Sequence, residues 1–424
     1  LEDIPDLCKR YGIHSIIIAI PTLKGSKLNH VIDLCVSTHC AVQLLSDPQL
    51  VGSGTPQQGA SREVNPADFL SRDEVTLDTD QISGYLTGKT VLVTGGGGSI
   101  GSELCRQVMR FKPGKLLIFD IYENCAYELL MELQQKYGRD IPVTVLIGSI
   151  RDKKRLDEVF ETYHPTVVFH AAAHKHVPLM EVSPAEAVKN NVLGTKNLLV
   201  SASEHDVERF VQLSTDKAVN PTSVMGCTKR ICEMLIQTFA GNTDMKCVAV
   251  RFGNVLGSHG SVIPLFEAQI KKGGPVTLTD PNIERYFMTI PEAAQLVLQA
   301  GALAESGNIY VLDMGEPVKI MDLAKQLIRF YGYEPGVNME IKIVGLRPGE
   351  KLYEELMMDE EQDKMRRTQH NKIFVASPRT IDLAEFYEQL QALEAAAAHN
   401  DEGVVRQLAA MIPTFTPTRE NLKL

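Results

Sequence analysis

A hydroxyl, a carboxylate and an amine follow one another at Thr215, Asp216 and Lys217. They come directly after residues 209–213, a mainly apolar run typical of a buried strand. A carboxylate beside an amine can move protons to and from a bound molecule, and partial burial tunes both groups. We therefore predict an acid–base centre at residues 215–217, with a solvated ion pair as the alternative.

Met225 and Lys229 stand four positions apart in a stretch with helical character. Residues at this spacing lie on the same face of a helix, so both side chains are expected beside the same site. The thioether of Met225 has no proton to give and is a weak acceptor, whereas Lys229 adds a second amine.

Three glycines, Gly95, Gly98 and Gly101, follow the apolar run of residues 90–93 and open a segment with helical character. Glycine lets a ligand approach the backbone, and a helix start presents free N–H groups and a positive dipole to a phosphate. The pattern predicts a dinucleotide-binding turn that includes Ser99 and Ile100. A flexible turn is the alternative.

Asp120 ends the next apolar run, 19 residues after Gly101. A carboxylate at this place binds the ribose 2′-OH of NAD and repels the additional phosphate of NADP, so NAD is the expected cofactor. An ordinary strand-end aspartate is the alternative. Asp152, after the third apolar run, can bind the adenine amine, cap a helix, or do both. Ala171, Ala172 and Ala173 follow the fourth run and are small enough for a cofactor to lie against the backbone.

Apolar strands and helical segments alternate along the chain, which predicts an α/β fold. We expect a Rossmann-like, doubly wound parallel sheet with a smaller C-terminal substrate-binding part, preceded by a small α/β domain. Strands are expected at 90–94, 115–120, 143–147, 166–171, 209–213, 246–251 and 309–313. Helices are expected at 99–111, 124–137, 152–163, 185–204, 222–240, 261–272, 291–304 and 320–331.

The predicted domains are a small α/β domain at residues 1–78, a catalytic domain at 79–376 and a helical tail at 377–424. Within the catalytic domain, the cofactor part covers about 86–250 and the substrate elements about 251–290 and 335–370. Residues 51–62 read as a loop or linker because they are rich in Gly, Ser and Gln.

The composition excludes several classes of partner. A chain of 424 residues with a net charge of −10 is not expected to bind nucleic acid or anionic membranes non-specifically. No apolar run approaches the roughly 20 residues of a membrane span. Eight cysteines without a C-x-x-C pair indicate reduced cytosolic thiols and no metal site. The first residue is Leu1, so a fragment of a longer protein is expected.

Five motifs carry a family resemblance, and they occur in the same order as in the family: residues 94–101, 170–178, 214–221, 251–258 and 347–351. From about residue 88 to 376 the chain resembles the extended short-chain dehydrogenase/reductase family. More closely, it is similar to the bacterial, membrane-anchored UDP-N-acetylglucosamine 4,6-dehydratases of polysaccharide biosynthesis. The wider family has tyrosine where this chain has Met225, and the long-form dehydratases resemble the chain in having methionine there.

The resemblance implies NAD-dependent loss of water from UDP-N-acetylglucosamine. Asp216 would remove the C4 hydroxyl proton and later protonate the leaving C6 hydroxyl, and Lys217 would remove the C5 proton. Thr215 would bind the C4 oxygen, and Lys229 the nicotinamide ribose. Substrate contacts are expected from Lys175, Asn254, Ser258, Ser261, Val262, Arg285, Arg347 and Glu350. Arg285 and Arg347 suit a diphosphate and Glu350 the ribose or uracil, with surface ion pairs as the alternative.

The segment 251–258 is expected to close over the sugar nucleotide. The resemblance also implies a homo-oligomer, and a cytoplasmic domain joined to the bacterial inner membrane by helices outside this chain. Two other functions stay open. One is a UDP-sugar 4-epimerase, which needs no C5 base, and the other is a non-catalytic NAD-binding regulator, which Met225 would permit.

Overall fold

The computed structural model describes residues 1–20, 23, 25–38, 40–45, 61–64, 68, 75–376, 381–400 and 403–417. Contacts between residues divide the chain into two compact units. The first unit contains Leu1–Glu74, Val255–Thr289 and Gly315–Gly345. The second contains Val75–Asn254, Ile290–Met314 and Leu346–Leu424.

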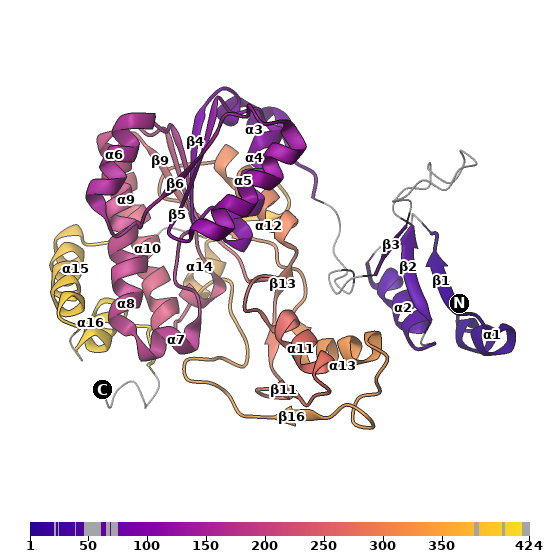
Figure 1. Ribbon diagram of the computed structural model, residues 1–424. Coiled ribbons are helices and arrows are strands. Elements are labelled where there is room, and N and C mark those ends of the chain that lie inside the picture. Colours follow the sequence, from indigo (N-terminus) through magenta and orange to yellow (C-terminus); the bar gives the residue numbers. More distant parts are fainter. Residues whose placement is uncertain are drawn as a thin grey trace. The chain divides into compact units, whose positions relative to one another are not determined.

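A nine-stranded sheet forms the centre of the second unit, in the order β17-β18-β14-β9-β8-β7-β4-β5-β6 (Figure 1). Its strands are β4 Thr90–Thr94, β5 Lys115–Asp120, β6 Val143–Ile147, β7 Val167–His170, β8 Arg209–Leu213, β9 Lys246–Arg251, β14 Ile309–Leu312, β17 Arg366–Arg367 and β18 Ile373–Ala376. Neighbouring strands from β14 to β6 are parallel. β18 is antiparallel to both β14 and β17. The predicted parallel sheet is therefore confirmed except at this mixed edge, where two short strands were not expected.

Helices cover both faces of this sheet, which explains why its central strands are mostly buried and mainly apolar. Figure 1 shows α3, α4, α5 and α12 on one side and α6, α9 and α10 on the other. Their bounds are α3 Thr79–Leu86, α4 Ser99–Arg110, α5 Glu123–Tyr137, α6 Lys153–Tyr163, α9 Gly194–Glu204, α10 Val224–Ala240 and α12 Ile290–Ala302. The chain reverses its direction across the sheet between β4 and β7. Ligands of such sheets bind beyond the carboxyl ends of the strands at this reversal.

The helix predicted over residues 185–204 consists of three pieces. They are α8 Pro184–Ala187, a π-helical turn Val188–Leu193, and α9. Within the π turn, the Asn191 side chain accepts a hydrogen bond from the His174 backbone N–H (2.8 Å) and donates one to Thr228 Oγ1 (3.0 Å). These bonds join the π turn to the segment after β7 and to α10. An apolar period of about 3.6 residues does not reveal a π turn.

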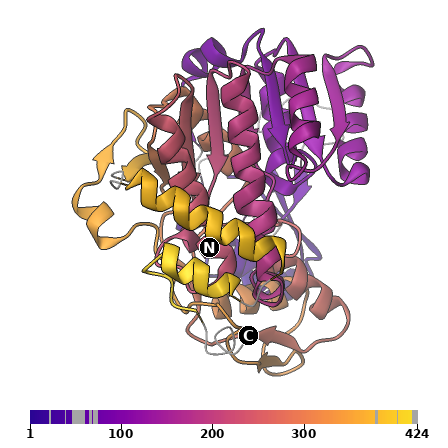
Figure 2. The same cartoon turned by 90° about the vertical axis from the view of Figure 1, so that its left-hand side faces the viewer.

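The last two helices, α15 Leu383–Ala398 and α16 Val404–Met411, extend the core of the second unit. Phe386, Leu390 and Leu408 are buried in the same apolar cluster as Ile231 and Leu235 of α10. Figure 2 shows α15 and α16 (yellow) on the side of the sheet that α10 covers. Within the predicted helical tail at residues 377–424, the first described helix begins at Leu383.

The first unit contains a three-stranded sheet in the order β1-β2-β3. Its elements are α1 Ile4–Tyr11, β1 Ser15–Ile18, α2 Gly25–Val36, β2 Ala41–Leu45 and β3 Ser61–Glu63. β2 is parallel to β1 and antiparallel to β3. Residues 51–60 of the predicted linker lie outside the described residues, and its last two residues belong to β3. The domain boundaries drawn from the sequence stay predictions.

The rest of the first unit consists of two helices and short strand pairs. The helices are α11 Val262–Lys271 and α13 Ile320–Phe330. The strand pairs join β10 Asn254–Val255 to β13 Phe287–Met288, β11 Val276–Leu278 to β16 Ile341–Ile343, and β12 Glu284–Arg285 to β15 Val318–Lys319. Among the residues that the structure describes, no helix is long and apolar enough to cross a membrane.

The second unit also contains two shorter helices, α7 Val177–Val182 and α14 Asp359–Asp363, and a 3₁₀ turn, Asp216–Ala218. The 3₁₀ turn follows β8 and α7 follows β7, so both lie after the carboxyl ends of neighbouring strands.

Candidate active site

The glycine turn joins β4 to α4 and has little room for side chains. Gly95 has a positive φ of 66°, which a residue with a side chain rarely adopts. A Cβ on Gly95 would lie 2.6 Å from the Ala172 backbone nitrogen, and one on Gly101 would overlap the Gly95 carbonyl oxygen. β4, α4 and the segment after β7 thus approach one another as closely as backbones can.

The start of α4 offers hydrogen-bond donors to an anion. Gly98 is the N-cap and supplies no side-chain acceptor. The first N–H groups of a helix have no partner within it, so the turn that contains Ser99, Ile100 and Gly101 suits a phosphate. The structure therefore brings the predicted turn residues together at one helix N-terminus.

Asp120 lies at the carboxyl end of β5, beside the glycine turn. Its carboxylate accepts hydrogen bonds from the backbone N–H groups of Gly97 (2.8 Å) and Tyr122 (2.9 Å). These two bonds fix the glycine turn against the end of β5, a role of Asp120 that the sequence did not indicate. The predicted contact of Asp120 with a ribose stays a prediction. Asp152 caps α6 by accepting a hydrogen bond from the Arg155 N–H (3.0 Å), which was one of its two predicted roles.

His170 and Lys229 lie in the interior near this turn. The His170 ring bonds Thr94 Oγ1 (2.7 Å) and Thr195 Oγ1 (2.9 Å). Burial, with a smaller effect of the Lys229 charge, lowers the pKa of His170 to about 3. Burial also lowers the pKa of the Lys229 amine, which comes from the first turns of α10. Lys175 lies on the segment between β7 and α7.

Thr215, Asp216 and Lys217 lie together at the carboxyl end of β8, and their acid–base role stays a prediction. The Lys217 amine donates hydrogen bonds to Asp216 Oδ1 (2.9 Å) and Asn254 Oδ1 (3.0 Å). Thr215 Oγ1 donates a third bond, also to Asp216 Oδ1 (2.9 Å). The Asp216 side chain is fully buried, and its other oxygen, Oδ2, has no hydrogen-bond partner among the described residues. A buried carboxylate oxygen without a donor is suited to accept a proton from a ligand.

The sequence did not indicate that Glu354 belongs to this group. Its Oε1 lies 3.6 Å from the Lys217 amine, and its side chain is 4% exposed. The residue stands three positions after the last predicted motif, residues 347–351. That spacing alone gave no reason to place a carboxylate beside Lys217.

Met225 and Lys229 lie on the helix that approaches this group most closely. Gly226 makes the approach possible, because a Cβ there would overlap the Lys217 carbonyl oxygen. The Met225 side chain is buried in the apolar cluster that also contains Ile231 and Leu235. The role of Gly226 was not predicted, since it depends on a contact between segments that the sequence does not reveal.

Arg251 is not part of the surface that was expected to close over a ligand. It is fully buried, and its guanidinium binds Glu233 through Nε (3.0 Å) and Nη2 (2.8 Å). It also binds Glu361 Oε2 (2.8 Å) and the Leu356 carbonyl (3.0 Å). Glu233 further accepts bonds from Ser214 Oγ (2.7 Å) and Arg230 Nη1 (2.8 Å). We name Arg230, Glu233, Arg251 and Glu361 the buried ion cluster.

The segment with Arg347 and Glu350 is fixed to the turn before α10. Thr222 Oγ1 donates to the Gly349 carbonyl (3.0 Å), and the Lys351 amine donates to the Val219 carbonyl (3.0 Å). Glu350 accepts a bond from the Arg347 backbone N–H (3.1 Å), and the Arg347 side chain is exposed. Their predicted substrate contacts stay predictions.

The other predicted substrate residues belong to the first unit. Ser261 precedes α11, which starts at Val262, and its backbone N–H donates to the Ser258 carbonyl (3.0 Å). The Ser261 hydroxyl is buried without a partner among the described residues. Arg285 lies in β12 and is buried, and its guanidinium donates to the Glu284 carbonyl (2.7 Å). That these residues meet the Asp216 group stays a prediction.

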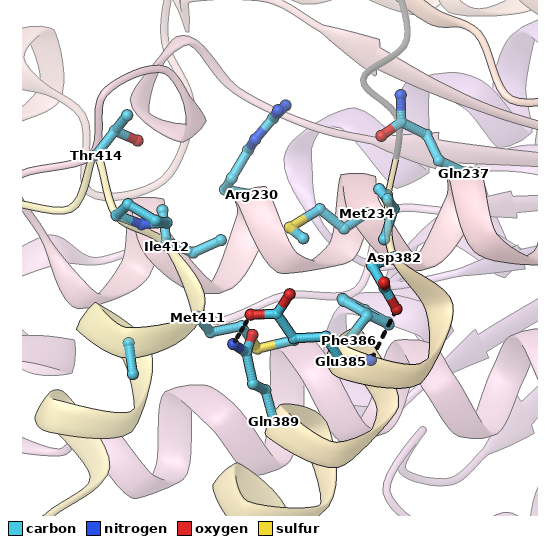
Figure 3. Close-up of a pocket in the computed structure, with 13 residues that line it drawn as sticks. Arg230, Met234, Gln237, Asp382, Glu385, Phe386, Gln389, Met411, Ile412 and Thr414 are labelled. Carbon is cyan, nitrogen blue, oxygen red and sulfur yellow. Dashed lines mark hydrogen bonds between the residues drawn. The ribbon is translucent and has the colours of Figure 1, made fainter.

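A pocket of about 190 Å³ lies between α10, α15 and the segment after α16 (Figure 3). Asp382 and Glu385 contribute polar groups, while Met234, Phe386 and Met411 contribute apolar ones. Neither polar atom of the Gln237 amide has a hydrogen-bond partner within the described part of the chain.

The sheet order and the glycine turn define a Rossmann-like α/β protein of the short-chain dehydrogenase/reductase type. A family model described as "Polysaccharide biosynthesis protein" matches residues 91–378, and the chain belongs to this family. It is 54% identical over 360 residues to the capsular polysaccharide biosynthesis protein CapD of Staphylococcus aureus, which covers 84% of this chain and 60% of CapD. The chain therefore spans about three-fifths of the length of this relative.

Two other relatives differ in their stated activity. A UDP-N-acetylglucosamine 4,6-dehydratase (inverting) of Campylobacter jejuni is 34% identical, with 63% of this chain and 76% of that protein covered. A UDP-glucose 4-epimerase of Rickettsia rickettsii is 33% identical, with 79% of this chain and 98% of that protein covered.

Solved structures share the fold. The X-ray structure of Pen from Bacillus thuringiensis is 34% identical, with a TM-score of 0.64 and 70% of this chain and 90% of that chain covered. A UDP-glucose 4-epimerase of Thermus thermophilus, solved with NAD, is 24% identical, with a TM-score of 0.55 and 63% and 90% covered. At that identity the likeness shows the fold alone.

Proposed function

We propose that the chain dehydrates UDP-N-acetylglucosamine to a UDP-2-acetamido-2,6-dideoxy-4-keto-hexose for glycan or polysaccharide synthesis. The observation that carries the proposal is the pairing of Asp216 with Lys217 at the carboxyl end of β8. One group is a buried carboxylate and the other an amine, as needed to handle two different protons of one sugar.

The residues around the glycine turn fit a nicotinamide dinucleotide. Glycine at positions 95 and 101 lets β4, α4 and the segment after β7 pack closely, and the α4 N-terminus suits a pyrophosphate. The Asp120 carboxylate favours NAD over NADP because it would repel a 2′-phosphate. When bound, the cofactor would accept a hydride from the sugar and return it. Lys229, on α10, would hold its nicotinamide ribose.

The chain's own residues then move the protons. Asp216 Oδ2 takes the proton of the C4 hydroxyl, and Thr215 binds the C4 oxygen. The 4-keto group acidifies the C5 proton, which Lys217 removes as a neutral amine. Asp216 gives its proton to the C6 hydroxyl, which leaves as water. Lys175, Arg347 and Glu350, together with the four predicted residues of the first unit, would bind the UDP-sugar.

A UDP-sugar 4-epimerase is the second candidate, supported by the likeness to the Rickettsia rickettsii enzyme. Epimerisation needs the same cofactor and a base at the C4 hydroxyl, but no base at C5. Lys217 beside Asp216 therefore favours dehydration. Attachment of the whole protein to a membrane, and its oligomeric state, stay predictions.

The deciding experiment is incubation with UDP-N-acetylglucosamine and NAD in deuterated water, followed by mass spectrometry and NMR. Loss of one water, with deuterium at C5, is the expected result, and the NMR coupling at C5 reports its configuration. Lys217→Ala should stop the elimination, whereas Lys153→Ala, which removes an amine on α6, should not.

Two results would refute the proposal. A product of unchanged mass and inverted C4 would identify an epimerase. Unchanged substrate, with NAD bound, would point to a regulator without catalytic activity.

A further inference from the structure

Lys217 lies between two carboxylates. Asp216 Oδ1 is 2.9 Å from the amine and Glu354 Oε1 is 3.6 Å from it. Both acids are shielded from water, with side chains 0% and 4% exposed, whereas Lys217 is 21% exposed. Charges in such a site interact more strongly than charges in water, so Glu354 influences where the amine's proton resides.

Other charged groups occur on the elements packed against the turn of Asp216 and Lys217. They are Lys229, Arg230 and Glu233 on α10, Glu181 on α7, and Lys351 and Glu355 on the segment after Gly349. Several are engaged elsewhere: Arg230 pairs with Glu233, Lys351 pairs with Glu355, and Glu181 accepts a bond from the Val224 N–H. Lys217 forms ion pairs with Asp216 and Glu354.

The buried ion cluster fixes the segment that carries Glu354. Arg251, at the end of β9, binds the Leu356 carbonyl and the Glu361 carboxylate. The same strand end is joined to the Asp216 turn, because the Asp216 N–H donates to the Phe252 carbonyl (3.0 Å). Arg251 thus connects the backbone of Asp216 to the segment that places Glu354 against Lys217.

We propose that Glu354 holds the ammonium proton of Lys217 while Lys217 acts as the C5 base, and that Arg251 and Glu361 position it for this task. The inference rests on the proposed dehydration. It answers a question that the proposed function leaves open, since an amine paired with carboxylates carries its proton and cannot accept another.

The proton transfers balance. At rest, Asp216 and Glu354 are carboxylates and Lys217 is an ammonium ion. When Asp216 accepts the C4 hydroxyl proton, Lys217 loses an anionic neighbour, and its proton passes to Glu354. The neutral amine then removes the C5 proton from the 4-keto sugar.

The return steps restore the group. Asp216 protonates the departing C6 hydroxyl, which leaves as water, and a C5–C6 double bond forms. As hydride adds to C6, Lys217 returns its proton to C5, and Glu354 returns the stored proton to Lys217. The net change is the loss of one water from the sugar.

The first test does not depend on turnover. Competitive acylation of lysines over a range of pH, read by peptide mass spectrometry, reports the pH at which the Lys217 amine becomes neutral. In Glu354→Gln the curve should move to lower pH by about one unit, because one neighbouring negative charge is gone. Glu355→Gln is the control, since Glu355 binds Lys351 and its side chain is 47% exposed. Superimposable Lys217 curves for the parent and Glu354→Gln would overturn the proposal.

The second test separates C4 oxidation from C5 exchange. In deuterated water near neutral pH, Glu354→Gln should exchange the C5 hydrogen about 100-fold more slowly than the parent, because the complex then has no Glu354 carboxylate to take the ammonium proton, and this loss outweighs the lower pH at which the amine becomes neutral. C4 oxidation, seen as transient reduced nicotinamide, should be unchanged. Glu354→Asp, which retains a carboxylate, should restore part of the exchange. Equal losses in both steps, or no loss of exchange, would overturn the proposal.

Failure of the proposed function gives a different result. If the parent loses no water from UDP-N-acetylglucosamine, dehydration is refuted and the proton-holding role falls with it. The acylation curve would then still show whether Glu354 controls the charge of Lys217. If the parent does dehydrate its substrate, only the Glu354 variants decide the inference.

Discussion

The buried ion cluster allows a stability prediction that can be worked out from the structure. Glu233→Gln removes one carboxylate from the cluster and leaves Arg230 and Arg251 with Glu361 alone. Both oxygens of Glu233 accept bonds from Arg251, and the side chain is fully buried. The substitution therefore leaves an uncompensated positive charge inside the protein.

Two estimates of the cost agree. Removing one partner of a buried ion pair costs about 3–5 kcal/mol. Burial alone would raise the pKa of Glu233, but the charges and hydrogen bonds of Arg251 and Arg230 outweigh it and hold the pKa at about 2, from 4.5. That difference corresponds to a free energy on the order of 3 kcal/mol. Because the folded-state pKa is depressed, this stability is present above pH 4.5 and is lost as the pH falls toward 2.

Urea unfolding followed by circular dichroism at neutral pH measures the cost directly. We expect Glu233→Gln to lower the free energy of unfolding by about 3 kcal/mol. The matched control is Glu208→Gln, which breaks a pair with Lys89 in which Glu208 is 50% exposed. Exposed pairs contribute only about 0–1 kcal/mol. A loss for Glu233→Gln no larger than that of the control would refute the reasoning.

Three further predictions follow from the same structure. Gly101→Ala should abolish NAD binding in calorimetry, since its Cβ would overlap the Gly95 carbonyl, while Gly84→Ala, with open space around it, should bind normally. Gln237→Met should stabilise the protein by about 1 kcal/mol in urea unfolding, because it removes buried polar atoms without partners. As the pH falls from 6.5 to about 3, His170 takes up a proton in the unfolded chain but not in the folded protein. The free energy of unfolding should therefore decrease over this pH range, and it should decrease less in His170→Asn.

The sequence was most informative where the local pattern is strong. Runs such as residues 90–94 and 115–120 are apolar on both faces and bounded by turns, and both strands were predicted to the residue. The glycine turn and the pair Asp216–Lys217 were predicted because their residues are close in the sequence. Element ends and the antiparallel edge were less predictable, since β17 and β18 are short and depend on pairing with β14.

The missed residues share one physical property: each acts through a contact with a distant part of the chain. Glu354 meets Lys217 across 137 positions, and Gly226 has its effect only because η4, the Asp216–Ala218 turn, packs against it. Arg251 was placed at the ligand surface because it begins a motif, yet its guanidinium faces Glu233 and Glu361 in the interior. Type and spacing identify a residue able to do chemistry, but they do not show which way its side chain points.

Met225 shows how the two kinds of information combine. The sequence alone says that a thioether cannot take over the work of a phenol, which leaves either lost activity or another base. The structure shows the surroundings of a candidate base, Asp216. Its Oδ1 accepts hydrogen bonds from Thr215 and Lys217, while its Oδ2 is buried and accepts no hydrogen bond among the described residues. Because two donors bind Oδ1, the orientation of the carboxylate is fixed, and so is the direction in which Oδ2 points. We therefore propose that Asp216 Oδ2, oriented at the end of β8, accepts the proton that Met225 cannot, which favours a relocated base over an inactive protein.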